Sequence, residues 1–373
     1  MAALERTDRV RGAYVFGDPN SDSEMVLAAM QQPFPELRHL SVALFETVLF
    51  VPDSFLGGSA PRLEFLELDE VLFPGLIKLL LSASHLVDLR LSNIPHSGYI
   101  SPDTMVTALS TLTSLSSFEL RFASPRSCPD LESRRSSPSI RAVLSVLSRF
   151  RFGGVSEYLE DLVACIDTPQ LSNLRITFFN DIVFDAPQLI QFIGRTPLPR
   201  ELEKAHLTFW DRGAAVNVSQ TSGYESGGFH VGISCRGSDW QLSYLEQVCT
   251  SCLLPFSKFE DLYLYEGLYW RRDNIENGLW LGLLQPFTAV KNLYLSEEFA
   301  TRIGPALQEL VGDRTTEVLP ALKNIFLEGF KSSDLSEPVE EGIRQLVAAR
   351  QVASRPIAVA RWANSEKEKQ HYY

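Results

Sequence analysis

The sequence contains no long uninterrupted run of apolar residues, although 45% of its 373 residues are hydrophobic. No stretch approaches the roughly 20 apolar residues that a membrane-spanning helix needs. The first ten residues, MAALERTDRV, carry charges that interrupt any apolar core, so we expect no secretory signal there. Cysteine is also scarce, and five residues, an odd number, fit a reducing compartment. We therefore expect an intracellular protein, located in the cytoplasm, with the nucleus also compatible.

Basic residues are in short supply relative to acidic ones. The chain has 34 Lys and Arg against 46 Asp and Glu, which gives a formal net charge of −12 at pH 7. A general nucleic-acid binder needs a basic face that neutralises phosphates, and an anionic membrane surface attracts the same sign of charge. The composition therefore disfavours both nucleic acid and membrane as partners.

Residue patterns that support catalysis or metal binding are missing as well. The six histidines are scattered, and no Ser/His/Asp order, glycine-rich phosphate loop or metal-spaced set of carboxylates stands out. Cys249 and Cys252 form a CxxC, but zinc needs two further ligands and no second pair exists. They share one face of a helical pattern with Leu242, Leu245 and Leu253, where cysteine packs as a small buried residue. We favour core packing over a zinc or redox site, and expect no enzyme activity, no cofactor and no metal.

What the sequence does contain is one short motif that is repeated many times, which we call the repeated line. FEDLYLYEG begins at Phe259, VKNLYLSEE at Val290 and LKNIFLEGF at Leu322, and each ends in the alternation that is typical of a half-buried strand. The line recurs from Leu37, Leu63, Leu86, Leu115, Leu147 and Leu171, and in weaker form from Val10 and Leu202. Most starts lie 23 to 32 residues apart, at or slightly beyond the long end of the roughly 20–29 residues of leucine-rich repeats.

Helical stretches separate these strands. SPDTMVTALSTL has a capping Ser101, with Pro102 at the first helical position. SEYLEDLVACI places four apolar residues on one face, namely Tyr158, Leu162, Val163 and Ile166, and EEFATRIGPALQELV and EPVEEGIRQLVAARQ also read as helices. One strand–loop–helix unit cannot bury its own apolar face, so neighbouring units must stack. The sequence predicts an α/β leucine-rich-repeat solenoid, a horseshoe with parallel strands on the concave face and helices outside.

The continuous repeat predicts one domain over residues 1–362, with an incomplete first repeat because the chain starts without a polar capping segment. Residues 124–139 lack apolar periodicity and predict a surface loop. Residues 214–235 place two alternating runs on either side of a Gly- and Ser-rich turn, which predicts a hairpin. The charged residues 363–373 predict a disordered tail.

The pattern resembles that of leucine-rich-repeat proteins, and the long, irregular repeats resemble those of F-box/leucine-rich-repeat proteins, above all F-box-like families of mushroom-forming fungi. The segments that carry the resemblance are AAMQQPFPELRHL, VPDSFLGGSAPRLEFLEL, FPGLIKLLLSASHLVDLRLSNIPHSGYIS, GVSEYLEDLVACIDTPQL and FTAVKNLYLSEEFA. In F-box families the repeats hold a substrate, while an N-terminal F-box docks on a cullin–RING ubiquitin ligase. No F-box is visible in this sequence.

The resemblance implies the substrate-recognition part of an F-box-like ubiquitin-ligase adaptor, with cullin–RING components as partners through a missing N-terminal module. The alternative is a stand-alone leucine-rich-repeat scaffold, or the sensor arm of an immune-type receptor, with no link to a ligase.

A ligand of such a solenoid is expected on the concave strand face. The middle position of each line is the residue between its last two apolar positions, such as Tyr263 between Leu262 and Leu264. Its side chain is expected to point onto the concave face. Neighbouring parallel strands lie about 4.8 Å apart, so side chains at the same position stack. The predicted column of middle residues is Ser41, Glu67, Arg90, Glu119, Arg151, Arg175, His206, Tyr263, Tyr294 and Phe326. Its first half alternates in charge, and its second half is aromatic.

We predict a protein ligand on this column, and the predicted partner-binding residues are Tyr263, Tyr265, Tyr294, Phe326, Arg90, Glu119, Arg151 and Arg175. Tyrosine on an open surface is a frequent binding hot spot. Cross-strand packing, worth roughly 0.2–1 kcal/mol per pair, accounts for the same column equally well. The flanking charges, Asp69, Asp88, Arg121 and Arg149, either add electrostatic selectivity or are simply solvated. All of this requires the strand register that the repeat predicts.

Overall fold

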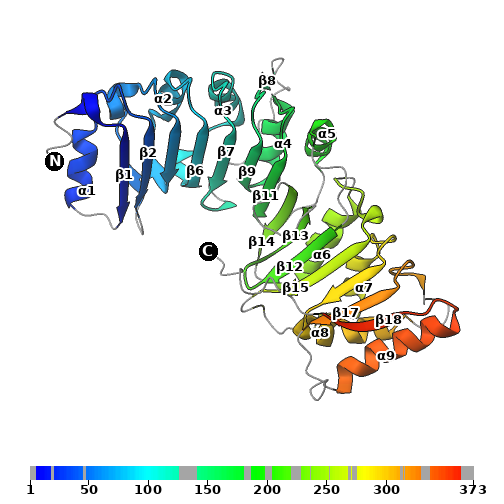
Figure 1. Cartoon of the computed structure of the whole chain (residues 1–373). Helices are drawn as coiled ribbons and strands as arrows, with labels where there is room; N and C mark the ends of the chain where they lie inside the picture. Colours follow the sequence, from blue (N-terminus) through cyan, green and yellow to red (C-terminus); the bar gives the residue numbers. More distant parts are fainter. Residues whose placement is uncertain are drawn as a thin grey trace. The chain divides into compact units, whose positions relative to one another are not determined.

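The computed structural model describes residues 6–17, 21–44, 48–125, 141–179, 186–197, 204–219, 228–235, 237–251, 253–267, 270, 275–310, 314, 316–328 and 337–362. Contacts within the chain divide it into two compact units, Met1–Leu198 and Pro199–Tyr373. We call them the N-terminal unit and the C-terminal unit (Figure 1). The single domain over residues 1–362 stays a prediction.

The N-terminal unit is built on a parallel sheet. Its strands, in spatial order, are β1 (Gly12–Gly17), β2 (His39–Leu44), β4 (Phe65–Asp69), β6 (Asp88–Ile94), β7 (Ser117–Phe122), β9 (Arg149–Gly154) and β11 (Asn173–Phe179). Two short parallel pairs join β3 (Leu49–Phe50) to β5 (Val71–Leu72) and β8 (Ala142–Val143) to β10 (Ile166–Asp167). The helices are α1 (Ser21–Ala29), α2 (Leu76–Ser82), α3 (Pro102–Leu109), α4 (Ser156–Ala164) and α5 (Pro187–Arg195). Helices α2 to α5 lie side by side along the sheet (Figure 1).

The C-terminal unit has a mixed sheet. Its strands, in spatial order, are β14 (Gly228–Ser234), β13 (Gly213–Ser219), β12 (Lys204–Trp210), β15 (Asp261–Glu266), β16 (Asn292–Leu295), β17 (Asn324–Glu328) and β18 (Ala358–Trp362). The pairs β14–β13 and β13–β12 are antiparallel, and the pairs from β12 to β18 are parallel. The helices are α6 (Ser238–Thr250), α7 (Asn277–Leu284), α8 (Glu297–Gln308) and α9 (Glu337–Val352), each packed on the next.

Most successive repeats begin with the same pattern of backbone hydrogen bonds. The Ser116 carbonyl, just before β7, accepts the backbone N–H groups of Ser148 and Arg149 in the next repeat, at 2.9 and 3.1 Å. The same pair of bonds is accepted by the carbonyls of Arg11, Arg38, Glu64, Val87, Ser148, Glu260 and Lys291. Because each strand starts from an equivalent carbonyl, residues at the same position of the repeated line lie opposite each other.

The predicted register is confirmed in both units. In the N-terminal unit, strand pairing joins Ser41 to Glu67, Arg90, Glu119, Arg151 and Arg175 in turn. In the C-terminal unit it joins His206 to Tyr263, Tyr294 and Phe326. The apolar positions of the line form the core. The inner positions, by which we mean the two apolar residues within each strand, are buried, as at Leu66 and Leu68. The first apolar residues of the line, which precede the strands, are all 0% exposed: Leu37, Leu63, Leu86, Leu115, Leu147 and Leu171.

Local signals place the helices as expected, with one correction. Ser101 caps α3 by accepting the N–H of Thr104 at 3.3 Å, and Pro102 is the first residue of that helix. In α4 the predicted apolar face is buried as far as Val163. Ile166 is buried too, but it belongs to strand β10, because the helix has already ended.

Helix α5 takes its cap from a neighbouring repeat. The residue before it, Ala186, supplies no side-chain cap. Instead, the backbone N–H groups of Gln188 and Leu189 donate to the carboxylate of Glu160 on α4, at 2.9 and 2.7 Å. A carboxylate at a helix N-terminus satisfies orphan donors and complements the helix dipole, so this contact ties adjacent repeats together on the helix side.

Several predicted features lie wholly or partly outside the described residues. Most of the predicted loop 124–139, the tail 363–373 and the turn of the predicted hairpin, 220–227, are among them, and so is Cys252. The arms of that hairpin are β13 and β14. Cys249 is 3% exposed on α6, and its burial raises the pKa of the thiol. The horseshoe shape stays a prediction.

Candidate functional site

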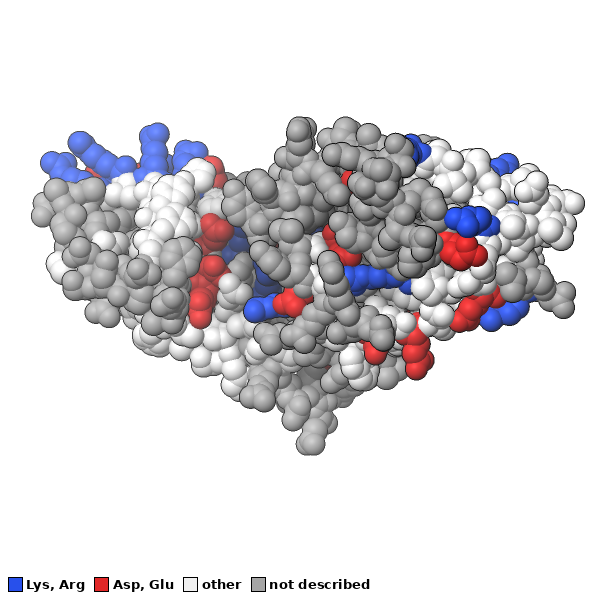
Figure 2. All heavy atoms as spheres, turned by 90° about the horizontal axis from the view of Figure 1, so that it is seen from below, with Lys and Arg blue, Asp and Glu red and all other residues white. Residues whose placement is uncertain are grey.

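Strand residues that alternate with the core positions point to the side of each sheet away from the core, which we call the open face. Matching residues form rows across neighbouring strands. In the N-terminal unit these rows are mostly polar and charged, and in the C-terminal unit they are aromatic and amide-bearing. Charged side chains of both signs reach the described surface seen in Figure 2.

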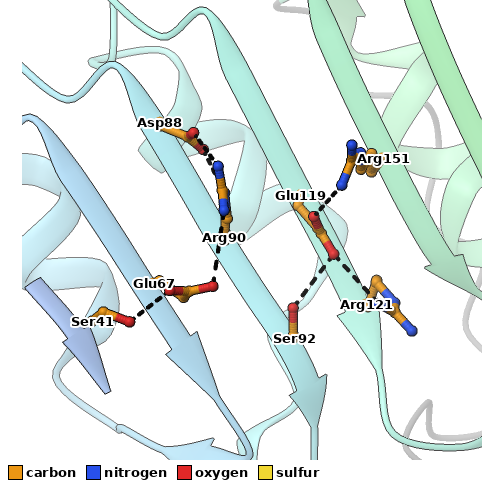
Figure 3. A network of polar contacts seen from close by, with 8 residues as sticks. All are labelled: Ser41, Glu67, Asp88, Arg90, Ser92, Glu119, Arg121 and Arg151. Atoms are coloured by element: carbon orange, nitrogen blue, oxygen red, sulfur yellow. Dashed lines mark hydrogen bonds and ion pairs between the residues drawn. The ribbon is translucent and has the colours of Figure 1, made fainter. Parts of the chain in front are cut away.

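One chain of polar contacts links β2, β4 and β6 (Figure 3). Ser41 Oγ donates to Glu67 Oε2 at 2.6 Å, and Arg90 Nη1 lies 4.0 Å from Glu67 Oε1. Arg90 also donates from Nε and Nη2 to the two carboxylate oxygens of Asp88, at 3.2 and 2.9 Å. This hydrogen bonding to Asp88 is the largest cause of the raised pKa of Arg90. Arg90 is thus held between two carboxylates within the sheet.

A second cluster is centred on Glu119 of β7. Its Oε1 lies 3.6 Å from Arg121 Nη1, its Oε2 lies 3.5 Å from Arg151 Nη1, and Ser92 Oγ donates to Oε1 at 3.5 Å (Figure 3). The Glu119 side chain is 11% exposed, whereas those of Arg121 and Arg151 are 55% and 47% exposed. The Glu119 carboxylate is therefore the buried centre of the cluster, and the two guanidinium groups that it contacts face solvent. Arg175 is half-buried on β11, opposite Arg151.

The C-terminal unit carries an aromatic ladder, which we define as His206, Tyr263, Tyr294 and Phe326. Ring centroids along it are 4.4, 4.1 and 4.6 Å apart, and neighbouring rings are within 12° of parallel. Tyr265 lies beside the ladder, with its ring centroid 6.1 Å from that of Tyr263. All four aromatic residues predicted from the sequence therefore come together on one face.

Stacking decides which parts of these rings a partner could touch. Parallel stacking covers ring faces and leaves edges and hydroxyl groups, so Tyr263, with a ring on each side, is only 8% exposed. Tyr265, Tyr294 and Phe326 are half-buried. Phe326 ends the ladder, because the residue opposite it on β18 is the exposed Ala360, which has no ring to stack. Burial, and then the Asp261 carboxylate, raise the pKa of Tyr294, so its hydroxyl is a neutral hydrogen-bonding group.

Amide groups flank the ladder, and the sequence prediction missed them. Asp261 Oδ1 accepts from Asn292 Nδ2 at 2.6 Å, and Asn292 Oδ1 accepts from Asn324 Nδ2 at 2.7 Å. All three residues hold the third position of the repeated line, a signal that could have found them. On the other side, Asn217 lies between His206 and His230 in the antiparallel strands. That register cannot be read from the repeated line.

A second missed feature is a partly buried ion pair in the C-terminal unit. Arg302 of α8 lies 3.0 Å from Glu266 at the end of β15, with both side chains about 15% exposed. The Arg302 guanidinium also lies 4.2 Å from the centroid of the Trp270 ring. Trp270 Nε1 in turn donates to Gln241 Oε1 on α6 at 2.7 Å. These contacts join α6, α8 and β15.

Within the described ranges, no group of three or more His, Cys, Asp or Glu side chains is placed to hold a metal ion. In the same part of the chain, no helix combines the length and the apolar character needed to cross a membrane.

No protein-family model matches the chain. No curated protein matches it either. Among solved structures, it is similar to the leucine-rich repeat-containing protein LegL7 from Legionella pneumophila, with 13% sequence identity over 90% of this chain and 97% of that one, and a TM-score of 0.36. At this TM-score the likeness carries no argument, so the fold rests on the strand pairings of the chain itself.

Proposed function

We propose that the protein is a leucine-rich-repeat type interaction module that binds a protein partner on the open faces of its sheets, and that it is not an enzyme. The observation that carries the proposal is the register-matched set of large side chains on the open face, on the side away from the core. Packing of the inner rows is already complete without them, because the inner leucines are fully buried. Tyrosine and arginine are the residues that concentrate binding energy at protein interfaces.

The aromatic ladder is the preferred contact in the C-terminal unit. Its stacked rings are held rigidly by their neighbours, so binding costs little side-chain entropy. Tyr294 is half-buried and presents a ring edge, and Phe326 presents its ring beside the small Ala360. The flanking amides of Asn292 and Asn324 add hydrogen-bonding groups next to the rings.

A narrower form of the proposal follows from the resemblance of the repeats. In that form the chain is the substrate-recognition part of an F-box-like ubiquitin-ligase adaptor of fungal type, and cullin–RING components accompany it through an N-terminal module. The alternative is a stand-alone scaffold, or the sensor arm of an immune-type receptor. The two forms differ in whether ligase components are found with the bound protein.

Site-specific photo-crosslinking tests the proposal. A photoreactive phenylalanine analogue replaces Tyr294 or Phe326 on the ladder, and Trp240 serves as the matched control, because it is an aromatic residue of α6 that is 67% exposed. Circular dichroism checks that each variant is folded. We expect Tyr294 and Phe326 variants to crosslink the same protein in cell extract, and the Trp240 variant not to. Equal products from all three positions, or none from the ladder, would contradict binding on this face.

The same captured material separates the narrower forms. Cullin–RING components present with the crosslinked protein support the adaptor, and a crosslinked partner without them supports the scaffold or sensor.

A further inference from the structure

We propose that the outer edge of β1 is a self-association surface, on which a second copy of this chain pairs its own β1 in antiparallel orientation. The pairing is centred on Val15, so that Tyr14 of each copy lies opposite Phe16 of the other. The sheets of the two N-terminal units then continue into each other across a two-fold axis. The inference goes beyond the proposed function, because it concerns the edge of the sheet and a partner identical to the chain itself.

The first argument is the unpaired edge of β1. Among the described strands, β1 pairs only with β2, over all six of its residues. The Arg11 carbonyl accepts two backbone N–H groups at the start of β2, so residue 11 faces β2. Backbone groups of alternate residues point to opposite edges of a strand. The N–H and C=O groups of Gly12, Tyr14 and Phe16 therefore point to the outer edge.

The second argument is that the residues at this edge also carry exposed rings. Tyr14 and Phe16 are 61% and 57% exposed, and their ring centroids lie 6.4 Å apart with the ring planes within 19° of parallel. Both residues alternate with Val15, which is only 8% exposed on the core side. The strand is thus seated on the core, and its two rings form an exposed apolar surface at the end of the sheet (Figure 1).

The third argument is the contrast with β18, which also has a described neighbour on one side only. Natural edge strands are protected against association by charged residues, prolines or bulges. Strand β18 exposes Arg361 and the small residues Ala358 and Ala360. Strand β1, with the sequence GAYVFG, has no charged residue and no proline, and its register with β2 is unbroken. The edge of β1 therefore lacks the protection that β18 has.

The fourth argument, which selects a second copy as the partner, is the symmetry of the strand sequence. About Val15 the residues are aromatic on both sides and small beyond them. An antiparallel copy centred on Val15 sets Tyr14 opposite Phe16, and Ala13 opposite Gly17. A two-fold axis makes each of these contacts twice, as in other isologous interfaces. Aromatic pairs directly opposite each other contribute roughly 0.2–1 kcal/mol each, and a register centred on Tyr14 would set Phe16 opposite Gly12 instead.

The backbone and the charges fit the same arrangement. Opposite residues of an antiparallel pair exchange two hydrogen bonds when the backbone groups of both point across the gap. Tyr14 and Phe16 are such a pair, and the pair occurs twice. Arg9 and Arg11 are exposed just before the strand. Antiparallel pairing places the arginines of the two copies at opposite ends of the joint, whereas parallel pairing would set these like charges side by side.

Sedimentation velocity of the full chain tests the inference. The mean mass of the wild type should rise from that of one chain towards that of two as the protein concentration increases. The double variant Tyr14→Lys, Phe16→Lys gives the edge the charges that protect other edge strands. It is expected to raise the Kd of the dimer about tenfold, which corresponds to about 1.4 kcal/mol. Circular dichroism checks that each variant is folded.

Phe50→Lys is the matched control, because Phe50 is a 60% exposed aromatic residue of β3 in the same unit. The Kd of its dimer should match that of the wild type. Tyr14→Ala and Tyr14→Pro then separate the ring from the backbone. Both lack the ring, but only proline also lacks the N–H that points to the outer edge, and its loss removes no bond to β2. Tyr14→Ala should weaken the dimer, and Tyr14→Pro should weaken it further.

Val15→Cys locates the centre of the pairing. In the proposed register the two copies of residue 15 lie directly opposite each other, with Cα atoms about 4.5 Å apart, within the range that a disulfide spans. Mild oxidation should therefore link two chains of this variant through a bond that a reductant removes. The wild type, treated in the same way, is the control, because its five cysteines all lie elsewhere in the chain.

Three results overturn the inference. The first is a wild type that keeps the mass of one chain at every concentration. The second is an equal dimer Kd for the double lysine variant and the wild type, which would place the contact on another surface. The third is a Val15→Cys protein that forms no more linked dimer than the wild type. None of these measurements involves another protein, so they leave the crosslinking test of the proposed function untouched.

Discussion

At the scale of single residues, Arg350 shows how a charged side chain can be buried for structural reasons. It is 0% exposed on α9, and its guanidinium donates to the carbonyls of Val318, Leu319 and Pro320, at 2.8, 3.1 and 3.5 Å. Leu319 has a φ of 49°, in the left-handed region, so this turn is one that the chain alone does not favour. No feature of the sequence distinguishes Arg350 from an exposed helix arginine, because its partners are backbone carbonyls about 30 residues away.

His206 makes a residue-scale prediction about pH. Burial, and then the nearby Lys204, lower its pKa from 6.5 to about 4. Above pH 6.5 the side chain is neutral in both folded and unfolded states, so it contributes no pH dependence. As pH falls from 6.5 to 4, the unfolded state takes up a proton that the folded state does not, and stability is lost, by about 3 kcal/mol in total.

The variant His206→Phe keeps a ring in the ladder but has no group to titrate. We expect the wild type to lose about 3 kcal/mol more unfolding free energy than this variant between pH 7 and pH 4, measured by urea denaturation. Equal pH dependence of the two proteins would show that His206 is solvated and not part of a tight stack.

At the scale of elements, the packing of α8 against α9 depends on two glycines. A Cβ atom on Gly342 of α9 would lie 2.5 Å from the carbonyl oxygen of Gly304 on α8, a backbone atom that cannot move aside. Gly342→Ala should therefore separate the helices and destabilise the protein by about 2 kcal/mol, despite the better helix propensity of alanine.

Gly278 of α7 is the matched control, because a Cβ atom there would meet nothing within 4 Å. Gly278→Ala should be neutral or stabilising, by about 0.5 kcal/mol. Thermal unfolding of the two variants beside the wild type measures both effects. A Gly342→Ala protein as stable as Gly278→Ala would mean that the helices are not in close contact.

The elements also show what the repeated line can and cannot predict. The strand positions and their register follow from it, because each copy starts from an equivalent carbonyl and buries the same two inner side chains. Strand β18 does not follow, since its inner positions are Val359, which is 46% exposed, and Arg361. An edge strand has a neighbouring strand on one side only, so its inner positions need not be leucines. The sequence of such a strand therefore lacks the apolar pattern of the repeated line.

The candidate site was predictable to the same extent. The column of middle residues, which includes Tyr294 and Arg151, follows from the strand register, and the repeat alone predicts that register. The loss of ring faces to stacking at Tyr263 depends on side-chain orientation, which the pattern does not contain. Nor does the pattern show that a Cβ atom on Gly153 of β9 would lie only 3.1 Å from Arg121 Cγ on β7, since this depends on a contact between two strands.

At the scale of the whole molecule, the division into two units leads to a prediction about how the chain unfolds. All five tryptophans belong to the C-terminal unit, namely Trp210, Trp240, Trp270, Trp280 and Trp362. Tryptophan fluorescence therefore reports on that unit alone, whereas far-ultraviolet circular dichroism reports on the strands and helices of both. If each unit unfolds as a body of its own, dichroism in urea should show two transitions and fluorescence only one of them.

One variant in each unit makes this assignment specific. Arg350→Met removes the donors to three carbonyls and should lower the fluorescence midpoint, with a loss of about 2 kcal/mol. Leu89→Ala, at a core position that is 0% exposed, should cost about 3 kcal/mol and shift only the dichroism transition that fluorescence does not see. If both variants instead move one shared transition in both probes, the chain folds as the single domain over residues 1–362 that its continuous repeat predicts.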